Sequence, residues 1–240
     1  SHWLPAPNYL LEMNGFPNAE KPDNGAQMLP AYPYGWPILS YLAGRIAGYQ
    51  LLNIGGILNM AMLLTFTPFA LRTVMDVIGR PMGPTIGWGL AAVCGLAATI
   101  LNPTFVQKIV LTAYSGVSTS VVTGFCALLT FHFLQSLGGR NRTAPWPAAW
   151  HLALALALLI NLRQTNLVVF LVILFALLLL SIRAPELSLR RLSVFLPLII
   201  GPALVVYIAW RLYVGAELSA QAGWEANFKP LELWNIKEIP

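Results

Sequence analysis

Charged side chains are scarce in this sequence: they make up 10% of its 240 residues, whereas 57% of the residues are hydrophobic. A water-soluble domain carries about 25% charged residues. A core of this size cannot bury so much apolar surface away from water, so a lipid bilayer is the natural solvent. The composition therefore excludes an ordinary soluble globular protein.

Cysteine and histidine are too few or too scattered to indicate the usual sites. Cys94 and Cys126 both lie inside apolar stretches, where they are typical of small buried residues rather than of a disulfide or metal pair. His2, His132 and His151 are far apart in sequence, which argues against a metal site. The basic residues are spread between apolar runs, so nucleic-acid binding is not expected. We expect no cofactor, and no divalent metal is indicated.

Long apolar runs are present instead, and they predict membrane-spanning helices of roughly 17–25 residues each. The fourth and fifth runs are short and form either two spans or one kinked hairpin. The fold class is therefore all-α, a polytopic transmembrane bundle with outer-face loops and short interfacial helices. We expect about six spans, at 51–71, 85–101, 114–134, 148–162, 166–182 and 194–214.

The spans divide the chain into three parts. Residues 1–50 are expected to form an outer loop with an interfacial helix, 51–214 the transmembrane bundle, and 215–240 the start of a second outer loop or domain. The chain starts at Ser1 and stops in a loop, so we expect a piece of a longer protein, with at least one span before Ser1.

The short loops predict the orientation, because arginine and lysine are enriched on the cytoplasmic side. One set of loops carries most of the arginines, with only Asp76 and Glu186 as acids; these arginines are Arg72, Arg80, Arg140, Arg142, Arg183, Arg190 and Arg191. The opposite set carries nearly all the acids: Glu12, Glu20, Asp23, Glu217, Glu225, Glu232 and Glu238. The first set should be cytoplasmic, so any chemistry is expected on the other face.

Three acids of the first outer loop are candidate catalytic residues. Glu12 stands among apolar residues in "YLLEMNG", where desolvation favours a general base; it either has that role or solvates a short interfacial helix. Glu20 and Asp23 stand in "NAEKPDNG", which is also typical of a solvated turn.

Basic and polar residues of the outer side are candidate phosphate ligands. Arg163 lies in "NLRQTN" between two apolar runs, where it either holds a phosphate or extends to the lipid headgroups. Gln164 beside it offers neutral hydrogen bonds. Lys108 is a second phosphate candidate, and Arg45 is placed to face the same headgroup zone.

The segment "PAYPYGWPIL" at 30–39 contains three prolines, three aromatic residues and one glycine, and it has no charged residue. It precedes the first span. Prolines restrict its backbone, so it predicts a rigid elbow. Tyr34 and Trp36 are residues of the membrane interface, and sugars also stack on such rings.

The stretch "YPYGWPILSYLAGRIAG", which begins at Tyr32, resembles a segment of bacterial membrane glycosyltransferases of the GT-C fold, relatives of the protein O-mannosyltransferases and of the lipid A aminoarabinose transferases. The order of "ATILNPTF", "LTAYSGVSTSVVTGF" and the "RQT" turn is similar too. The resemblance implies a polyprenyl-phosphate sugar donor, a base in the first outer loop, and basic outer residues that hold the phosphate. It makes Glu12 the first candidate base, before Asp23 and Glu20, and Arg163 and Lys108 the phosphate ligands.

The expected function is thus transfer of a sugar from a polyprenyl-phosphate donor to an unknown acceptor on the outer face. The expected setting is a bacterial inner membrane, with the active face periplasmic or extracellular. The alternatives are a transporter and a non-catalytic membrane subunit. A transporter should place polar residues at mid-membrane, whereas the polar candidates here lie at the outer rim.

Overall fold

The computed structural model describes residues 5–18, 20–21, 33–49, 54–79, 88–89, 92–93, 96, 115–139, 144–163, 165–183 and 189–218. All regular secondary structure in this part of the chain is helical, which confirms the predicted all-α fold. The elements are α1 (Pro5–Met13), α2 (Gly35–Ala47), α3 (Ile54–Val77), α6 (Ser115–Leu137), α7 (Pro145–Leu162), α8 (Asn166–Arg183), α9 (Leu189–Tyr213) and a π-helical turn η1 (Val214–Leu218).

Five of the described helices are long and apolar enough to cross a bilayer: α3, α6, α7, α8, and α9 with η1. The shortest of them have 18 residues, or about 27 Å at 1.5 Å per residue, which is close to the roughly 30 Å of a bilayer core. The chain is therefore an integral membrane protein. The lengths of α7 and α8 favour two separate spans over an incompletely crossing hairpin.

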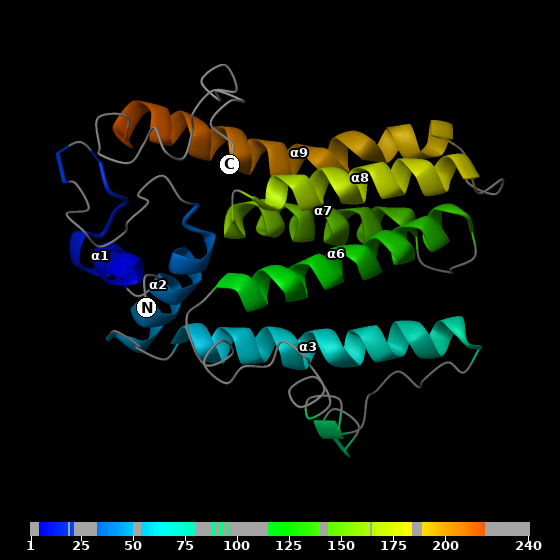
Figure 1. Ribbon diagram of the computed structural model, residues 1–240, viewed down its shortest axis with the longest axis horizontal. Helices are drawn as coiled ribbons and strands as arrows, with labels where there is room; N and C mark the ends of the chain where they lie inside the picture. The colour runs from blue at the N-terminus through cyan, green and yellow to red at the C-terminus, as the bar shows by residue number, and fades with distance from the viewer. Residues whose placement is uncertain are drawn as a thin grey trace, which may run out of the picture.

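The long helices run side by side, as Figure 1 shows. The helices α3, α6 and α8 run in one direction along the bundle, and α7 and α9 run back. Because α3 and α6 are parallel, the chain between them has to return to the end where α3 began. The span predicted at 85–101 falls in this connection and lies outside the described residues, apart from five isolated positions.

The helix α7 lies at the centre of the bundle and packs on α6, α8 and α9. Its buried side chains recur at three- and four-residue spacing, which places them along one broad face. They are Ala149, Leu152, Ala153, Leu156, Leu159, Ile160 and Leu162. This face joins buried residues of α6, α8 and α9 in one continuous core.

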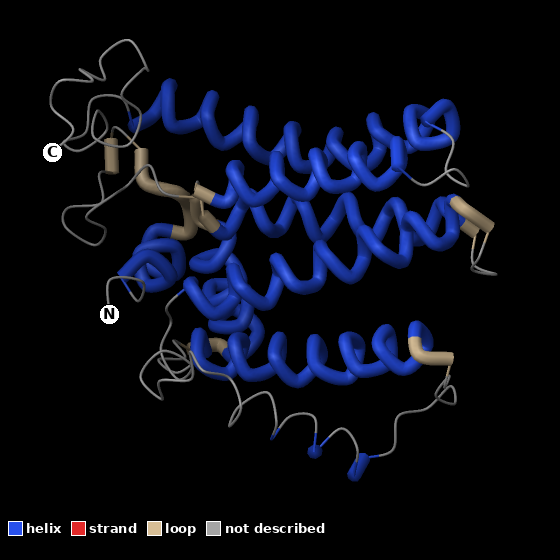
Figure 2. The backbone as a smooth tube through the Cα atoms, turned by 45° about the vertical axis from the view of Figure 1, so that its right-hand side comes forward, coloured by secondary structure: helices blue, strands red, loops and turns tan. Residues whose placement is uncertain are grey.

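The helix α3 lies at the edge of the bundle, where it packs on α6 and α2 (Figure 2). The ring of Phe66 lies over Gly124 of α6, so close that a β-carbon at Gly124 would come within 2.6 Å of the ring. Further along, Thr73 Oγ1 donates to the carbonyl of Phe69 at 2.9 Å and lies 2.9 Å from Nε2 of His132. Since the hydroxyl proton is already used, we assign the proton of this second bond to His132 Nε2.

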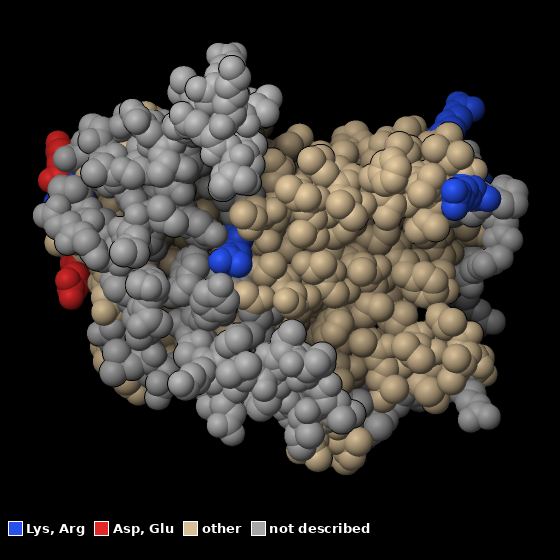
Figure 3. Space-filling view, viewed as in Figure 1, with Lys and Arg blue, Asp and Glu red and all other residues tan. Residues whose placement is uncertain are grey.

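The two ends of the bundle differ, and we name them by what they carry. The cap end carries α1, α2 and η1, and the arginine end carries Arg72, Arg183, Arg190 and Arg191. In Figure 3 the visible acidic side chains lie at the left-hand cap end, basic ones lie at the arginine end and also nearer the cap end, and most of the remaining described surface is uncharged. That the arginine end is cytoplasmic stays a prediction from the loop arginines.

Candidate functional site

Aromatic side chains hold the N-terminal segment against the end of α9. The ring of Phe16 makes edge contacts with Tyr34 at 5.5 Å, Trp210 at 6.0 Å and Tyr213 at 5.8 Å between centroids. We call these four residues the cap cluster. The Tyr213 hydroxyl also donates to the carbonyl of Pro17 at 2.8 Å. Residues nearly two hundred positions apart are thereby joined at the cap end.

The elbow packs against the last turn of α7. A β-carbon built on Gly35 would lie 2.8 Å from the carbonyl carbon of Asn161 and 2.9 Å from its Cγ, so only glycine fits without a shift of backbone. The next side chain, Trp36, is 1% exposed and joins the core around α7. Gly35, with Pro33 and Pro37 on either side, therefore lets the start of α2 lie directly against the end of α7.

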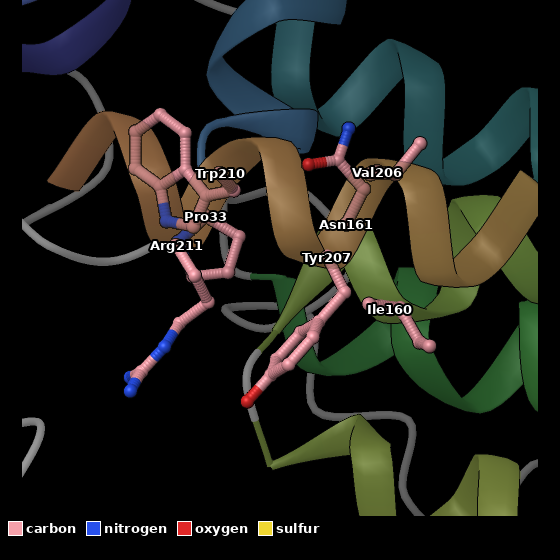
Figure 4. A pocket seen from close by; sticks show the side chains of 7 residues that line it. All are labelled: Pro33, Ile160, Asn161, Val206, Tyr207, Trp210 and Arg211. Atoms are coloured by element: carbon pink, nitrogen blue, oxygen red, sulfur yellow. The ribbon is translucent and has the colours of Figure 1, made fainter. Parts of the chain in front are cut away.

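A narrow hollow lies beside this junction, and we call it the rim hollow. The elbow, the last turn of α7 and the last two turns of α9 line it, with mainly apolar walls; the lining residues are Pro33, Ile160, Asn161, Val206, Tyr207, Trp210 and Arg211. In Figure 4 the side chains of Tyr207 and Arg211 project from α9 toward the same side. Two polar groups thus project together from α9 at the cap end, in a hollow whose other polar lining residue is Asn161.

Both polar groups are partly exposed and stand next to an exposed apolar surface of α9. Tyr207 and Arg211 are four residues apart and share a face of α9. The neighbouring stripe of the helix carries exposed apolar side chains at the same spacing: Leu204, Ile208 and Leu212. Arg211 stands in the last turn of α9, where the negative end of the helix dipole favours a cation.

Arg163 lies at the cap end as well, in the turn between α7 and α8, but it does not line the rim hollow. It ends α7 in an extended conformation (φ −154°, ψ 141°) and is half-buried. The nearby Asn166 is buried and donates to the carbonyl of Leu159 at 2.7 Å, so its amide closes the turn rather than facing a ligand. Gln164 and Lys108 lie outside the described residues.

The predicted catalytic acids do not meet the rim hollow in the described part of the chain. Glu12 lies on α1 with its side chain exposed, and it is not among the lining residues. Glu20 is exposed in a turn whose backbone N–H groups, its own and that of Lys21, donate to the side chain of Asn18 at 3.1 and 2.8 Å. This is the solvated-turn alternative for Glu20. Asp23 lies outside the described residues.

The aromatic residues proposed to stack on a sugar are inside the protein. Tyr34 and Trp36 are each 1% exposed, so neither offers an open ring face in this structure. Arg45 is exposed on α2, beside an exposed apolar face that includes Ile46 at 89% and Tyr49 at 66%. Such exposed apolar side chains beside an arginine are typical of the headgroup level, and the placement of Arg45 there stays a prediction.

Sequence reasoning missed the four polar or aromatic residues of the rim hollow: Asn161, Tyr207, Trp210 and Arg211. A signal was present, because "YIAWR" ends the last span with a tyrosine and an arginine four residues apart. What the sequence does not reveal is that the elbow packs beside them. Among the described residues, no group of three histidine, cysteine or acidic side chains could hold a metal ion.

Comparisons with protein-family models, with curated proteins and with solved structures gave no match to this chain.

Proposed function

We propose that this protein binds a polyprenyl-phosphate sugar at the cap end and transfers the sugar to an acceptor on that face of the membrane. The observation that carries the proposal is the rim hollow, where Arg211 and Tyr207 stand beside a lipid-facing apolar stripe of α9. The proposal also keeps the function expected from the resemblance to the GT-C glycosyltransferases.

The donor has an apolar tail and a polar phosphosugar head. The end of α9 likewise presents an exposed apolar stripe next to the polar side chains of the rim hollow. An apolar tail would lie along Leu204, Ile208 and Leu212, which are exposed where lipid surrounds the bundle. The phosphate would meet the guanidinium of Arg211, whose planar donors match phosphate oxygens. The sugar would lie toward Tyr207, whose hydroxyl can hydrogen-bond the sugar hydroxyls.

The reaction breaks the bond between the sugar's anomeric carbon and the phosphate oxygen, and it forms a bond from that carbon to the acceptor oxygen. Arg211 would stabilise the negative charge that grows on the leaving polyprenyl phosphate. A base takes the acceptor's proton, and it would come from the first outer loop. Glu12 is the first candidate for that base, with Glu20 and Asp23 after it.

The direct test of the phosphate site is Arg211→Gln in the complete protein, reconstituted in nanodiscs with radiolabelled polyprenyl phosphate. Loss of a charged hydrogen bond of about 1.5–3 kcal/mol predicts binding roughly 10- to 100-fold weaker. Arg72→Gln, at the opposite end of the bundle, is the control and should bind like the wild type. Arg163→Gln in the same assay asks whether the turn residue contributes to the site. Unchanged binding by Arg211→Gln would remove the basis of the proposal.

Glu12→Gln separates catalysis from binding. If Glu12 is the base, sugar transfer falls roughly a hundredfold or more while polyprenyl-phosphate binding is kept. Full transfer by this variant would move the role to another acid. Binding without any transfer in the wild-type protein would favour the non-catalytic subunit, and movement of the sugar lipid across the membrane would favour the transporter.

A further inference from the structure

Three exposed arginines surround the turn between α8 and α9 at the arginine end. Arg183 stands in the last turn of α8, and Arg190 and Arg191 stand in the first turn of α9. We call these three residues the basic turn. Figures 1 and 2 both show the ends of α8 and α9 side by side there, and Figure 3 shows basic side chains at this end of the bundle. These three positive charges therefore lie at one corner of the molecule.

The charges of Arg190 and Arg191 are unfavourably placed within their own helix. The first turn of a helix presents unpaired N–H groups and the positive end of the dipole, and it favours anions. The first turn of α9 holds no acidic residue, and instead it adds two guanidinium groups to this positive end. The described acid at this end of the bundle, Asp76, belongs to α3, which packs on α6 and α2. Glu186, in the connection between α8 and α9, lies outside the described residues. Within the described part of the chain, an external anion is the partner that this arrangement fits.

Aromatic side chains lie immediately deeper in the bundle. Arg191 and Phe195 are four residues apart on one face of α9, and the ring of Trp146 packs on Phe195 at 4.9 Å between centroids. Trp146 and Trp150 share a face of α7 and remain 53% and 49% exposed. Tryptophan at this exposure is typical of the boundary between headgroups and acyl chains. The arginines thus stand at headgroup level, with the indoles below them.

We propose that the basic turn binds the headgroup of an anionic phospholipid in the leaflet at the arginine end. The headgroup phosphate meets Arg190 and Arg191 at the start of α9, and Arg183 adds a third charge. The acyl chains lie against Trp146 and Trp150 and against the exposed Val194 one turn along α9. Charge complementarity selects an anionic lipid, and the adjoining apolar surface selects a lipid over a soluble phosphate. The proposal is independent of sugar transfer.

The test is lipid binding to the intact, delipidated protein, titrated with phosphatidylglycerol or phosphatidylcholine and followed by native mass spectrometry. Wild type should bind phosphatidylglycerol more tightly. The double variant Arg190→Gln/Arg191→Gln should bind it roughly 10- to 30-fold more weakly, and Arg183→Gln should lose a smaller part. Arg72→Gln, which removes a charge from the same end but from α3, should keep the wild-type affinity.

Three results would overturn the proposal. Equal binding of the two lipids by the wild type would exclude charge selection. If Arg72→Gln lost as much affinity for phosphatidylglycerol as the double variant, the overall charge of this end, rather than the basic turn, would explain the binding. Binding of soluble glycerol phosphate as tightly as of phosphatidylglycerol would assign the site to a free phosphate. Because the substituted arginines are exposed, folding should be kept, and the unfolding temperature of each variant in neutral detergent checks this.

Discussion

Replacement of Gly35 by alanine is the sharpest perturbation of the cap. The new β-carbon would overlap the backbone of Asn161, which is fixed in the last turn of α7 and cannot turn aside as a flexible side chain can. Overpacking of this kind typically costs about 1–3 kcal/mol. The gain in helix propensity is small, because Gly35 is the first residue of α2 rather than an interior one. The expected net loss is about 1–2 kcal/mol of stability.

Gly201→Ala is the matched control. Gly201 stands inside α9, and a β-carbon there would meet nothing within 4 Å. Alanine is favoured over glycine by about 1 kcal/mol in a helix interior, so this variant should be neutral or more stable. At roughly 2–4 °C per kcal/mol, Gly35→Ala should unfold about 2–8 °C below the wild type, and Gly201→Ala at or above it.

Labelling of the Cys126 thiol on heating measures the stability of these variants. The Cys126 side chain is fully buried on α6, so a thiol-reactive dye labels it only when the bundle opens. With Cys94 replaced by serine, the labelling temperature in detergent reports unfolding through one site. Membrane proteins often unfold irreversibly, so all variants are heated at one rate. Equal labelling temperatures for Gly35→Ala and Gly201→Ala would refute the argument that the elbow packs against the backbone of α7.

Two further predictions concern topology and the α7–α8 turn. Cysteine at Tyr49, which is exposed at the cap end, should react with an impermeant thiol reagent in intact cells, and cysteine at Ile78 should not; the reverse pattern would invert the orientation. Asn166→Ala should lose about 1–3 kcal/mol, because the carbonyl of Leu159 is left without its 2.7 Å donor, whereas Thr165→Ala on the exposed turn should change the unfolding temperature little.

The spans could be predicted from sequence because a bilayer demands a fixed length of apolar helix. The observed helices begin or end at other residues than predicted where local sequence signals matter more than hydropathy. The helix α7 begins at Pro145 rather than 148, since proline suits the first position of a helix. The helix α9 begins at Leu189 rather than 194, because its first turn carries two arginines that lower the hydropathy of the window. It continues through Pro197 and Pro202, as expected for a packed membrane helix.

The site was harder to predict because it depends on contacts between distant segments. Tyr34 was expected at the interface, yet its ring packs at 5.4 Å on Trp210, which is 176 positions further along the chain. No local periodicity encodes that pairing. The same contact places the elbow beside Tyr207 and Arg211, so the rim hollow could not be assembled from motifs alone. Composition correctly indicated the membrane, but not which of the arginines at the cap end would line a hollow.

The helix α9 carries arginines at both ends, and the helix dipole predicts opposite effects of neutralising them. Arg190 and Arg191 stand at the positive end, so in neutral detergent without anionic lipid Arg190→Gln/Arg191→Gln should raise the unfolding temperature. Arg211 stands in the last turn of α9, which η1 extends by five residues, so Arg211→Gln should lower it by a smaller amount. Each charge contributes about 0.3–1 kcal/mol by this effect. Added phosphatidylglycerol should reverse the first result, because only the native protein carries the bound lipid. Shifts of the same sign for both variants in neutral detergent without anionic lipid would show that the dipole does not govern these arginines.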